Sequence, residues 1–224
     1  MSFQPLFFLR GSQPTRTSNW NKNSTVLPDT LGRSFSLSFT SDEQNIFYNT
    51  QAFPAHDKEK HSEPTLYHPP PHYHLWTDEY FHVTSGSGTW HFWDKSVHLS
   101  KGDDLRVPRW AWHWFEGDPS SDDPLITRVR YNKGNAAMEE RFFRNTLSYL
   151  GDCHREGVQF GVCQLMIFFL YAEIAPGLRI VRFERLNMIL NVLIMYILAG
   201  IGLLMGYQAS YEEYYLEGGN KKRD

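Results

Sequence analysis

Residues 72–79 read HYHLWTDE, which places two histidines two positions apart and a glutamate five positions after the second. Because residues two apart on an extended strand face the same side, His72 and His74 point together into the interior. Glu79 has the parity of the opposite face if the segment is one straight strand. A turn through residues 76–78 brings Glu79 onto the next strand, where it faces the same interior. The run therefore predicts that the three side chains converge.

Residues 102–113 read GDDLRVPRWAWH and add a third histidine, His113, after a strand break marked by Pro108. Three neutral imidazoles and one carboxylate form a borderline-soft ligand set that suits Fe(II), Mn(II), Ni(II) or Zn(II). Four protein ligands leave one or two positions of an octahedral ion free for water or substrate. We therefore expect one divalent transition-metal ion as cofactor, held by His72, His74, Glu79 and His113.

Short alternating runs fill residues 31–134, and turn signals such as Gly86-Ser87-Gly88 separate them. Many short strands at regular spacing are typical of a β-sandwich or β-barrel. The expected strands are Arg33–Thr40, Asn45–Thr50, Tyr80–Thr84, Thr89–Trp93, Ser96–Leu99, Leu105–Val107, Trp112–Phe115 and Leu125–Tyr131. The charged and proline-rich stretch His56–Pro71 is expected to form a loop, and residues 1–30 a lead-in segment over the fold surface.

The spacing of these residues resembles the two sequence motifs of the cupin superfamily. The pattern His72-x-His74-x4-Glu79-x6-Gly86 is similar to the first motif, and Gly102-x5-Pro108-x4-His113 is similar to the second. Fifteen residues separate Gly86 from Gly102, which is similar to the spacing in compact single-domain cupins. The resemblance covers residues 60–120 and implies a mainly β fold, a jelly-roll barrel, with the same four residues as metal ligands.

Three positions depart from the motifs. Leu66 stands where the first motif opens with glycine, Trp110 replaces a glycine of the second, and Gly117 occupies a position that is often asparagine. These are turn and backbone positions, so the departures concern local geometry more than metal binding.

Strand alternation predicts which side chains surround the ion. Ala111 and Phe115 share a side with His113, and Phe81 and Val83 share a side with Glu79. An apolar pocket around a charged ion suits a hydrophobic or aromatic small molecule as substrate. The alternative interpretation of these four residues is plain core packing.

Two arginines are further candidates for the pocket. Arg106 and Arg128 would bind a substrate carboxylate through two parallel hydrogen bonds if they point inward. The alternative is that both are solvated surface residues.

Any chemistry is expected to depend on the metal, because no Ser-His-Asp order, nucleotide-binding glycine loop or CxxC pair stands out. Metal ions polarise carbonyl groups, or bind substrate and O2 together when they are redox-active. The candidate general base is Glu79 or a metal-bound hydroxide. We expect an oxygenase or a lyase/isomerase. The alternatives are a non-catalytic module that binds a ligand and a structural cupin that forms oligomers through its helices.

The pattern changes to helical after residue 134. The expected helices are Ala136–Leu150, ended by Gly151, then Val158–Ala172 and Ile180–Gln208. Met188–Tyr207 holds twenty residues without a charge, about the length that crosses a bilayer core. Three arginines precede this run, and the positive-inside tendency would place the barrel in the cytosol. The alternative is a helix packed on the barrel or in an oligomer interface, such as a homodimer.

The composition narrows the functional class. The chain has 224 residues and a net charge of −3, so nothing indicates a nucleic-acid partner. Two cysteines are too few for a disulfide framework and fit a reduced compartment. The N-terminus lacks the apolar core of a signal peptide, so we expect an unprocessed chain. A small cupin followed by helices resembles uncharacterised cupin-domain proteins of fungi and bacteria, some encoded beside biosynthetic enzymes, which implies a role in secondary metabolism.

Overall fold

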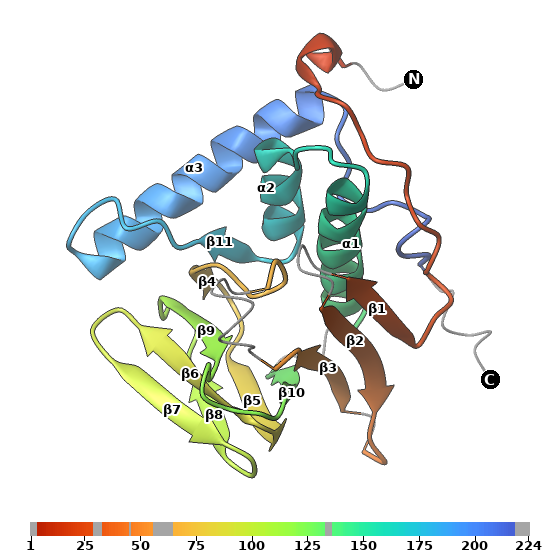
Figure 1. Ribbon diagram of the computed structural model, residues 1–224. Helices are drawn as coiled ribbons and strands as arrows, with labels where there is room; N and C mark the ends of the chain where they lie inside the picture. The colour runs from red at the N-terminus through yellow and green to blue at the C-terminus, as the bar shows by residue number, and fades with distance from the viewer. Residues whose placement is uncertain (1–3, 29–32, 45, 56–64, 133–135, 218–224) are drawn as a thin grey trace. The chain divides into compact units, whose positions relative to one another are not determined.

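The computed structural model describes residues 4–28, 33–44, 46–55, 65–132 and 136–217. The expected loop His56–Pro71 lies partly outside these ranges, since residues 56–64 are not described. The chain divides into two compact units, which Figure 1 colours along the sequence. We call Asn23–Ala136 with Gly177–Arg179 the barrel unit, and Met1–Lys22 with Ala137–Pro176 and Ile180–Asp224 the helical unit.

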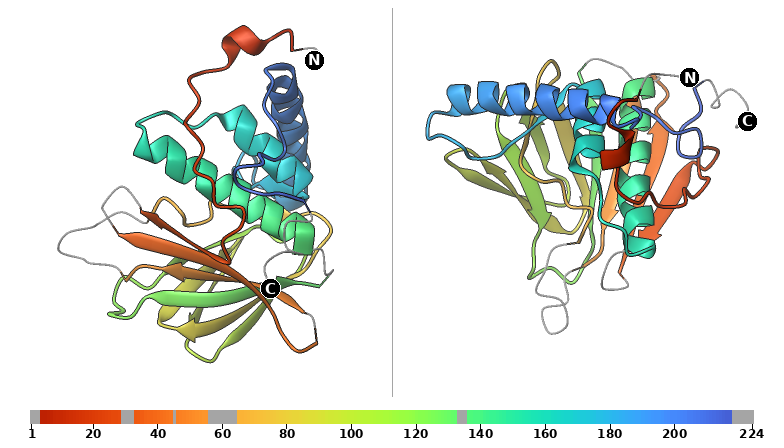
Figure 2. Two further views of the ribbon diagram at one scale, coloured as in Figure 1. Left: turned by 90° about the vertical axis from the view of Figure 1, so that its right-hand side faces the viewer. Right: turned by 90° about the horizontal axis from the view of Figure 1, so that it is seen from above.

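The barrel unit contains two antiparallel sheets (Figures 1 and 2). The first has the strand order β1-β2-β3-β10-β5-β8, and the second contains the order β4-β9-β6-β7. The strands of the first sheet are β1 (Ser24–Pro28), β2 (Ser34–Ser41), β3 (Phe47–Phe53), β10 (Leu125–Tyr131), β5 (Glu79–Ser85) and β8 (Asp104–Val107). Those of the second are β4 (His72–His74), β9 (His113–Gly117), β6 (Ser87–Phe92) and β7 (Ser96–Ser100).

Apolar alternation decides which face of each strand is buried. In β10 every second residue, from Leu125 to Tyr131, is buried, and the residues between them are only half-buried. Aromatic rings fill the space between the sheets: Phe81 of one sheet packs on Trp90 and Phe115 of the other, with ring centroids 5.4 and 5.3 Å away. The predicted fold class, a jelly-roll β-barrel followed by helices, is confirmed.

The helical unit contains α1 (Ala136–Arg155), α2 (Val162–Tyr171), the short strand β11 (Ile174–Pro176), α3 (Glu184–Leu204) and the 3-10 turn η1 (Phe7–Leu9). The prediction that Gly151 ends the first helix is wrong, because α1 continues to Arg155. Asp152, one position further on, is buried and accepts hydrogen bonds from the Thr17 amide and the Tyr214 hydroxyl. These contacts stabilise another turn of the helix. Gly157, with φ of +63°, follows the end of α1 at Arg155.

Candidate metal centre

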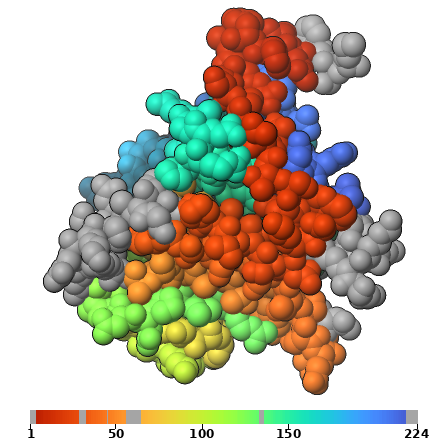
Figure 3. All heavy atoms as spheres, turned by 45° about the vertical axis from the view of Figure 1, so that its right-hand side comes forward, coloured from red at the N-terminus to blue at the C-terminus, as the bar shows by residue number. Residues whose placement is uncertain are grey.

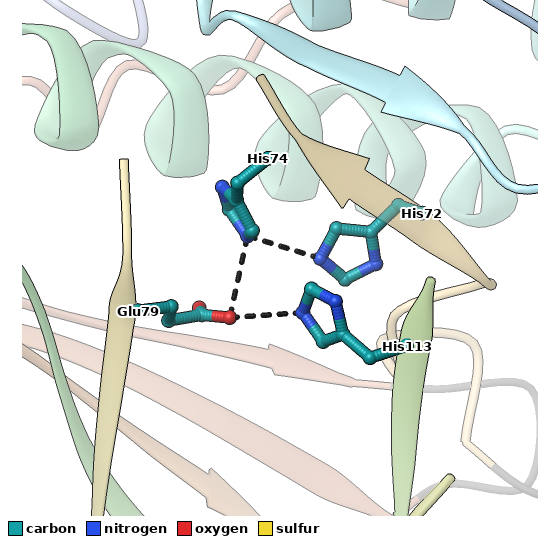
Figure 4. Close-up of side chains that lie close together, drawn as sticks. All are labelled: His72, His74, Glu79 and His113. Carbon is teal, nitrogen blue, oxygen red and sulfur yellow. Dashed lines mark hydrogen bonds and ion pairs between the residues drawn. The ribbon is translucent and has the colours of Figure 1, made fainter. Parts of the chain in front are cut away.

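The four predicted ligands come from three strands of the barrel unit, β4 and β9 of one sheet and β5 of the other (Figure 4). His72 and His74 are the ends of β4, and His113 begins β9, where it pairs directly with His72. The bend that the parity of Glu79 requires lies at Leu75 and Trp76, and Glu79 is the first residue of β5. One ligand atom from each of the four side chains lies within 4.8 Å of all the others.

All four side chains are nearly inaccessible to solvent, with residue exposures from 0 % for His113 to 8 % for His72. The Nε2 atoms of His72 and His74 are 3.2 Å apart. Oε2 of Glu79 lies 3.2 Å from Nε2 of His74 and 3.0 Å from Nε2 of His113. The donor atoms therefore surround one small volume, as the dashed lines of Figure 4 show.

Backbone carbonyls fix the tautomers of two rings. Nδ1 of His72 lies 2.8 Å from the Pro70 oxygen, and Nδ1 of His113 lies 3.0 Å from the Ala111 oxygen. Because a carbonyl oxygen only accepts, each Nδ1 carries the proton, and each neutral ring directs the lone pair of Nε2 toward the cluster. The same arrangement orients metal-binding histidines in general.

Electrostatics in the cluster favour a neutral imidazole beside an ionised carboxylate. Burial lowers the pKa of His72 well below its ordinary 6.5, and the neighbouring imidazoles of His113 and His74 lower it further. Burial alone would raise the pKa of Glu79. When these rings are protonated, positive charge at His74 and hydrogen bonds from His113 and His74 outweigh burial and hold this pKa well below 4.5. The carboxylate therefore needs a cation beside it, while burial disfavours placing that charge on His72.

These observations show that the residues fit a divalent metal ion. Unprotonated Nε2 atoms of His72 and His74 would face each other at 3.2 Å as two acceptors, a contact that a shared cation makes favourable. The donor set of three imidazoles and one carboxylate is the kind that binds first-row transition metals. The residues that would hold the ion are His72, His74, Glu79 and His113.

Tyr131, at the end of β10, completes the carboxylate's environment and was not predicted from the sequence. Its hydroxyl donates to Oε1 of Glu79 over 3.2 Å, which leaves Oε2 directed at the histidines. Tyr131 pairs with Glu79 across the β10–β5 ladder and shares its parity with Thr127 and Val129, which are fully buried. That parity is the signal in the sequence, but it identifies the tyrosine only when the strand pairing is known.

Asp78 anchors the residue before Glu79. Its carboxylate accepts from the Arg109 amide at 3.0 Å and from Nε and Nη2 of Arg106 at 3.0 and 2.6 Å. Its own amide donates to Oδ1 of Asn132, and its carbonyl accepts from the Asn132 amide. The backbone that carries the carboxylate ligand is thus held on both sides.

Trp110, which replaces a motif glycine, keeps the backbone conformation that favours glycine. Its φ is +69°, in the left-handed region, and its amide donates to the His74 carbonyl over 2.8 Å. The loop before His113 thereby holds the end of β4. The departure from the motif preserves the turn and introduces backbone strain beside the ligands.

The predicted apolar pocket residues lie in the interior of the barrel unit, except for Ala111. Phe81, Val83 and Phe115 are at most 3 % exposed. Phe115 also stacks on Trp90 at a centroid distance of 5.1 Å, so two of the four residues belong to the aromatic core. Ala111 is half-buried and contributes its carbonyl to His113.

The prediction that Arg106 and Arg128 reach the ion's pocket is corrected by the structure. Arg128 lies between the fully buried Thr127 and Val129 on β10, so it faces the outer side of the sheet, and the Arg106 side chain is 61 % exposed. Both line an outer groove of about 390 Å³, whose other residues are Tyr48, Tyr80, Phe81, His82, Asp104, Leu105 and Arg130. The guanidinium of Arg128 stacks 4.1 Å from the ring centroid of Tyr48.

Comparisons with known proteins identify the family. A family model described as a cupin domain matches residues 61–125. The probable oxidoreductase virH of Hypocrea virens is 34 % identical over 158 residues, covering 69 % of this chain and 71 % of that protein. Oxidoreductase iacF of Pestalotiopsis fici is 35 % identical over 105 residues, covering 45 % of this chain and 52 % of that protein. The chain belongs to the cupin superfamily.

Solved structures of similar proteins include two bacterial cupins. A cupin-2 domain protein of Shewanella frigidimarina has a TM-score of 0.32 and 16 % identity, over 42 % of this chain and 78 % of that chain. A cupin-like protein of Thermotoga maritima has a TM-score of 0.33 and 20 % identity, over 52 % of this chain and 77 % of that chain.

Proposed function

We propose that the protein is a metal-dependent cupin enzyme of secondary metabolism that acts on a small hydrophobic or aromatic molecule, as an oxygenase or a lyase/isomerase. The observation that carries the proposal is the buried convergence of three imidazoles and one carboxylate, with donor atoms within 4.8 Å of one another. The names of two relatives, probable oxidoreductase virH and oxidoreductase iacF, support the redox alternative.

Each residue of the cluster has a role in this proposal. His72, His74 and His113 offer neutral nitrogen donors, and the carbonyls of Pro70 and Ala111 keep two of those rings in the required tautomer. Glu79 supplies the negative charge of the ligand set, and it stays the candidate general base. When bound, a divalent ion supplies Lewis-acid or redox chemistry.

The surroundings of the cluster determine which substrates suit it. The barrel interior that carries the ligands is lined by buried aromatic and aliphatic side chains, among them Phe81 and Val83. Such a lining excludes water and favours apolar ligand surface. The metal is expected to be Fe, Mn, Ni or Zn, and the substrate a small organic molecule.

Turnover by purified protein tests the proposal. Protein with its metal identified by elemental analysis is incubated with intermediates of neighbouring biosynthetic pathways, under air and under argon, and products are followed by mass spectrometry. We expect a product that disappears in His72→Ala/His113→Ala and persists in His82→Ala/His98→Ala. The control pair lies away from the cluster, with His82 and His98 side chains 43 % and 52 % exposed.

The same experiment separates the alternatives. A non-catalytic binding module would retain a ligand tightly without turnover under either gas. A structural cupin would be unaffected by metal removal. Product formation only under air identifies an oxygenase, whereas formation under both gases identifies a lyase or isomerase.

A further inference from the structure

The helix α3 buries two asparagines, two small residues and Met195, and it exposes seven large apolar residues. Its buried residues recur on one side at helical spacing: Asn187, Asn191, Met195, Ala199 and Gly202. The opposite side, which we call the α3 apolar face, consists of seven residues between 42 and 61 % exposed: Leu186, Ile189, Leu193, Tyr196, Ile197, Leu203 and Leu204. An exposed apolar surface of this extent marks an interaction site.

Contacts within the helical unit fix the rotation of α3. Oδ1 of Asn187 accepts from the amides of Ile180 and Val181 at 2.7 and 3.1 Å, and Nδ2 of Asn191 donates to the Asn187 carbonyl at 2.8 Å. At Gly202, a Cβ atom would lie 2.9 Å from the Cys163 carbonyl oxygen of α2, so the two backbones approach closely. The apolar face is therefore held outward by satisfied polar groups on the other side.

The same contacts argue against α3 crossing a bilayer in this fold. Although the length and apolar composition of α3 permit a span, its neighbour α2 has ten residues, about 15 Å, and reaches only half of a bilayer core. A crossing would also carry the buried ion pair of Arg144 and Glu140 in α1 toward lipid, or detach α3 and expose its asparagines. A helix lying along the membrane surface meets neither difficulty.

The turn η1 extends the apolar surface beyond the end of α3. The Leu6 amide donates to the Leu204 carbonyl over 3.1 Å, which places η1 at the C-terminal end of the helix (Figure 1). Its residues Phe7, Phe8 and Leu9 are 56, 77 and 56 % exposed. In Figure 3 the red spheres of this segment stand out beside blue spheres of the C-terminal part. Adjacent exposed aromatic residues are common where proteins contact the interfacial region of a bilayer.

The charges around this surface complement anionic lipid. Arg182 and Arg185 are exposed at the N-terminal end of α3, and Arg10 follows η1 at the other end. The sequence from residue 186 to residue 211 contains no charged residue. Glu184 lies between the two arginines in the first turn of α3, so three basic residues face one acidic residue around this surface. Basic residues beside an apolar surface attract negatively charged headgroups.

We propose that the helical unit docks on the surface of an anionic bilayer, with α3 lying along the membrane plane and Phe7, Phe8 and Leu9 inserted at the end of the helix. We assign lipid rather than a second copy of the chain to this surface. In a dimer the basic residues beside the apolar face would meet the same basic residues of the partner, and no opposite charge would face them. This inference is independent of the metal chemistry, and vesicle binding is measurable without any substrate.

Co-sedimentation with vesicles tests the docking. The full chain is expected to bind mixed phosphatidylcholine/phosphatidylserine vesicles, and to bind pure phosphatidylcholine vesicles more weakly. Leu193→Glu/Ile197→Glu should lower the partition coefficient roughly tenfold or more, since two apolar side chains are lost from the contact. The control Ala137→Glu/Gln159→Glu adds the same charge at exposed positions outside the apolar face and should reduce binding less. Absence of binding by the parent chain, or an equal loss in both variants, would overturn the proposal.

Two further measurements separate this arrangement from its rivals. Sedimentation equilibrium without lipid should give the mass of a monomer. If the parent chain is instead a dimer, and the variant Leu193→Glu/Ile197→Glu is a monomer, the α3 apolar face is a dimer interface and docking on lipid is overturned. Fluorescent labels are attached to cysteine variants in a Cys163→Ser background: Ile189→Cys, Tyr196→Cys and Leu203→Cys. Quenchers placed along the lipid chains then report how deep each label lies in the bilayer. Equal, shallow depths support the in-plane helix, whereas a much deeper label at position 196 would indicate a span.

Discussion

The Nε2 atom of His113 lies 3.0 Å from Oε2 of Glu79, while Nδ1 of the same ring donates to the Ala111 carbonyl. An imidazole protonated at Nδ1 is an acceptor at Nε2, and the carboxylate is ionised, so two lone pairs face each other. Such a contact is favourable when a proton or a metal ion lies between the two groups. This relationship is the physical basis for assigning a metal centre.

Removal of the metal is expected to lower thermal stability. A ligand present at 100 times its Kd stabilises the folded state by about 2.7 kcal/mol, which corresponds to roughly 5–10 °C in Tm for a chain of this size. Calorimetry before and after dialysis against a chelator measures the change, and added divalent metal should reverse it. An identical Tm in both samples would contradict a bound ion.

Tyr131→Phe is expected to weaken metal binding while leaving the fold intact. The lost hydroxyl frees Oε1 of Glu79, and loss of such a supporting hydrogen bond lowers metal affinity by about 10–100-fold. Competition with a coloured chelator measures the affinity. Tyr48→Phe is the matched control, because its hydroxyl contacts Asp42 instead. Equal affinities in the two variants would show that Tyr131 does not position the carboxylate.

Substitutions at Trp110 test its backbone strain. A left-handed conformation costs a residue with a side chain about 1–2 kcal/mol, and glycine avoids this cost. Glycine instead lowers the free energy of unfolding by about 0.4–1 kcal/mol, because it has more conformational freedom in the unfolded chain. The free energy of unfolding of Trp110→Gly, measured in urea, should therefore lie within about 1 kcal/mol of the parent value. Trp110→Val, with a β-branched side chain, should be clearly less stable than the glycine variant. The reverse order would mean that the indole ring, and not the φ angle, determines stability here.

The loop after β9 contributes a pH-dependent stabilisation through Asp118. Hydrogen bonds from the Ser120 hydroxyl and amide, and from the Ser87 hydroxyl, hold the pKa of Asp118 below its ordinary 3.8. The folded state thus favours the carboxylate, and the stabilisation is present above pH 3.8 and is lost as the pH falls below it. Asp118→Asn should be about 1 kcal/mol less stable at neutral pH, with the difference shrinking in acid. Urea titrations at several pH values measure the difference in free energy of unfolding between the parent and Asp118→Asn. A difference that does not change with pH would contradict the prediction.

The convergence of the four side chains and the fold were predictable because both depend on local patterns. His72 and His74 share parity on one strand, and the spacing to Glu79 and His113 resembles a known motif. Tyr131 was missed because its contact with Glu79 depends on the pairing of β10 with β5, fifty-two residues apart in the chain. Such pairing is not visible in one sequence.

Other errors have the same origin in long-range contacts. The arginines Arg106 and Arg128 were assigned inward as one alternative, since alternation fixes which residues share a face but not which face is buried. Gly151 was expected to end a helix, but tertiary hydrogen bonds to Asp152 extend α1. The cytosolic location of the barrel, the homodimer and the metal's identity stay predictions.

Metal stoichiometry tests the central claim most directly. Elemental analysis of the purified chain should find about one equivalent of a single divalent transition metal, because the four donors surround one volume. His72→Ala/His113→Ala should lose the metal, and His82→Ala/His98→Ala should retain it. A parent chain that binds no divalent metal after reconstitution, or a ligand variant that keeps a full equivalent, would contradict the account.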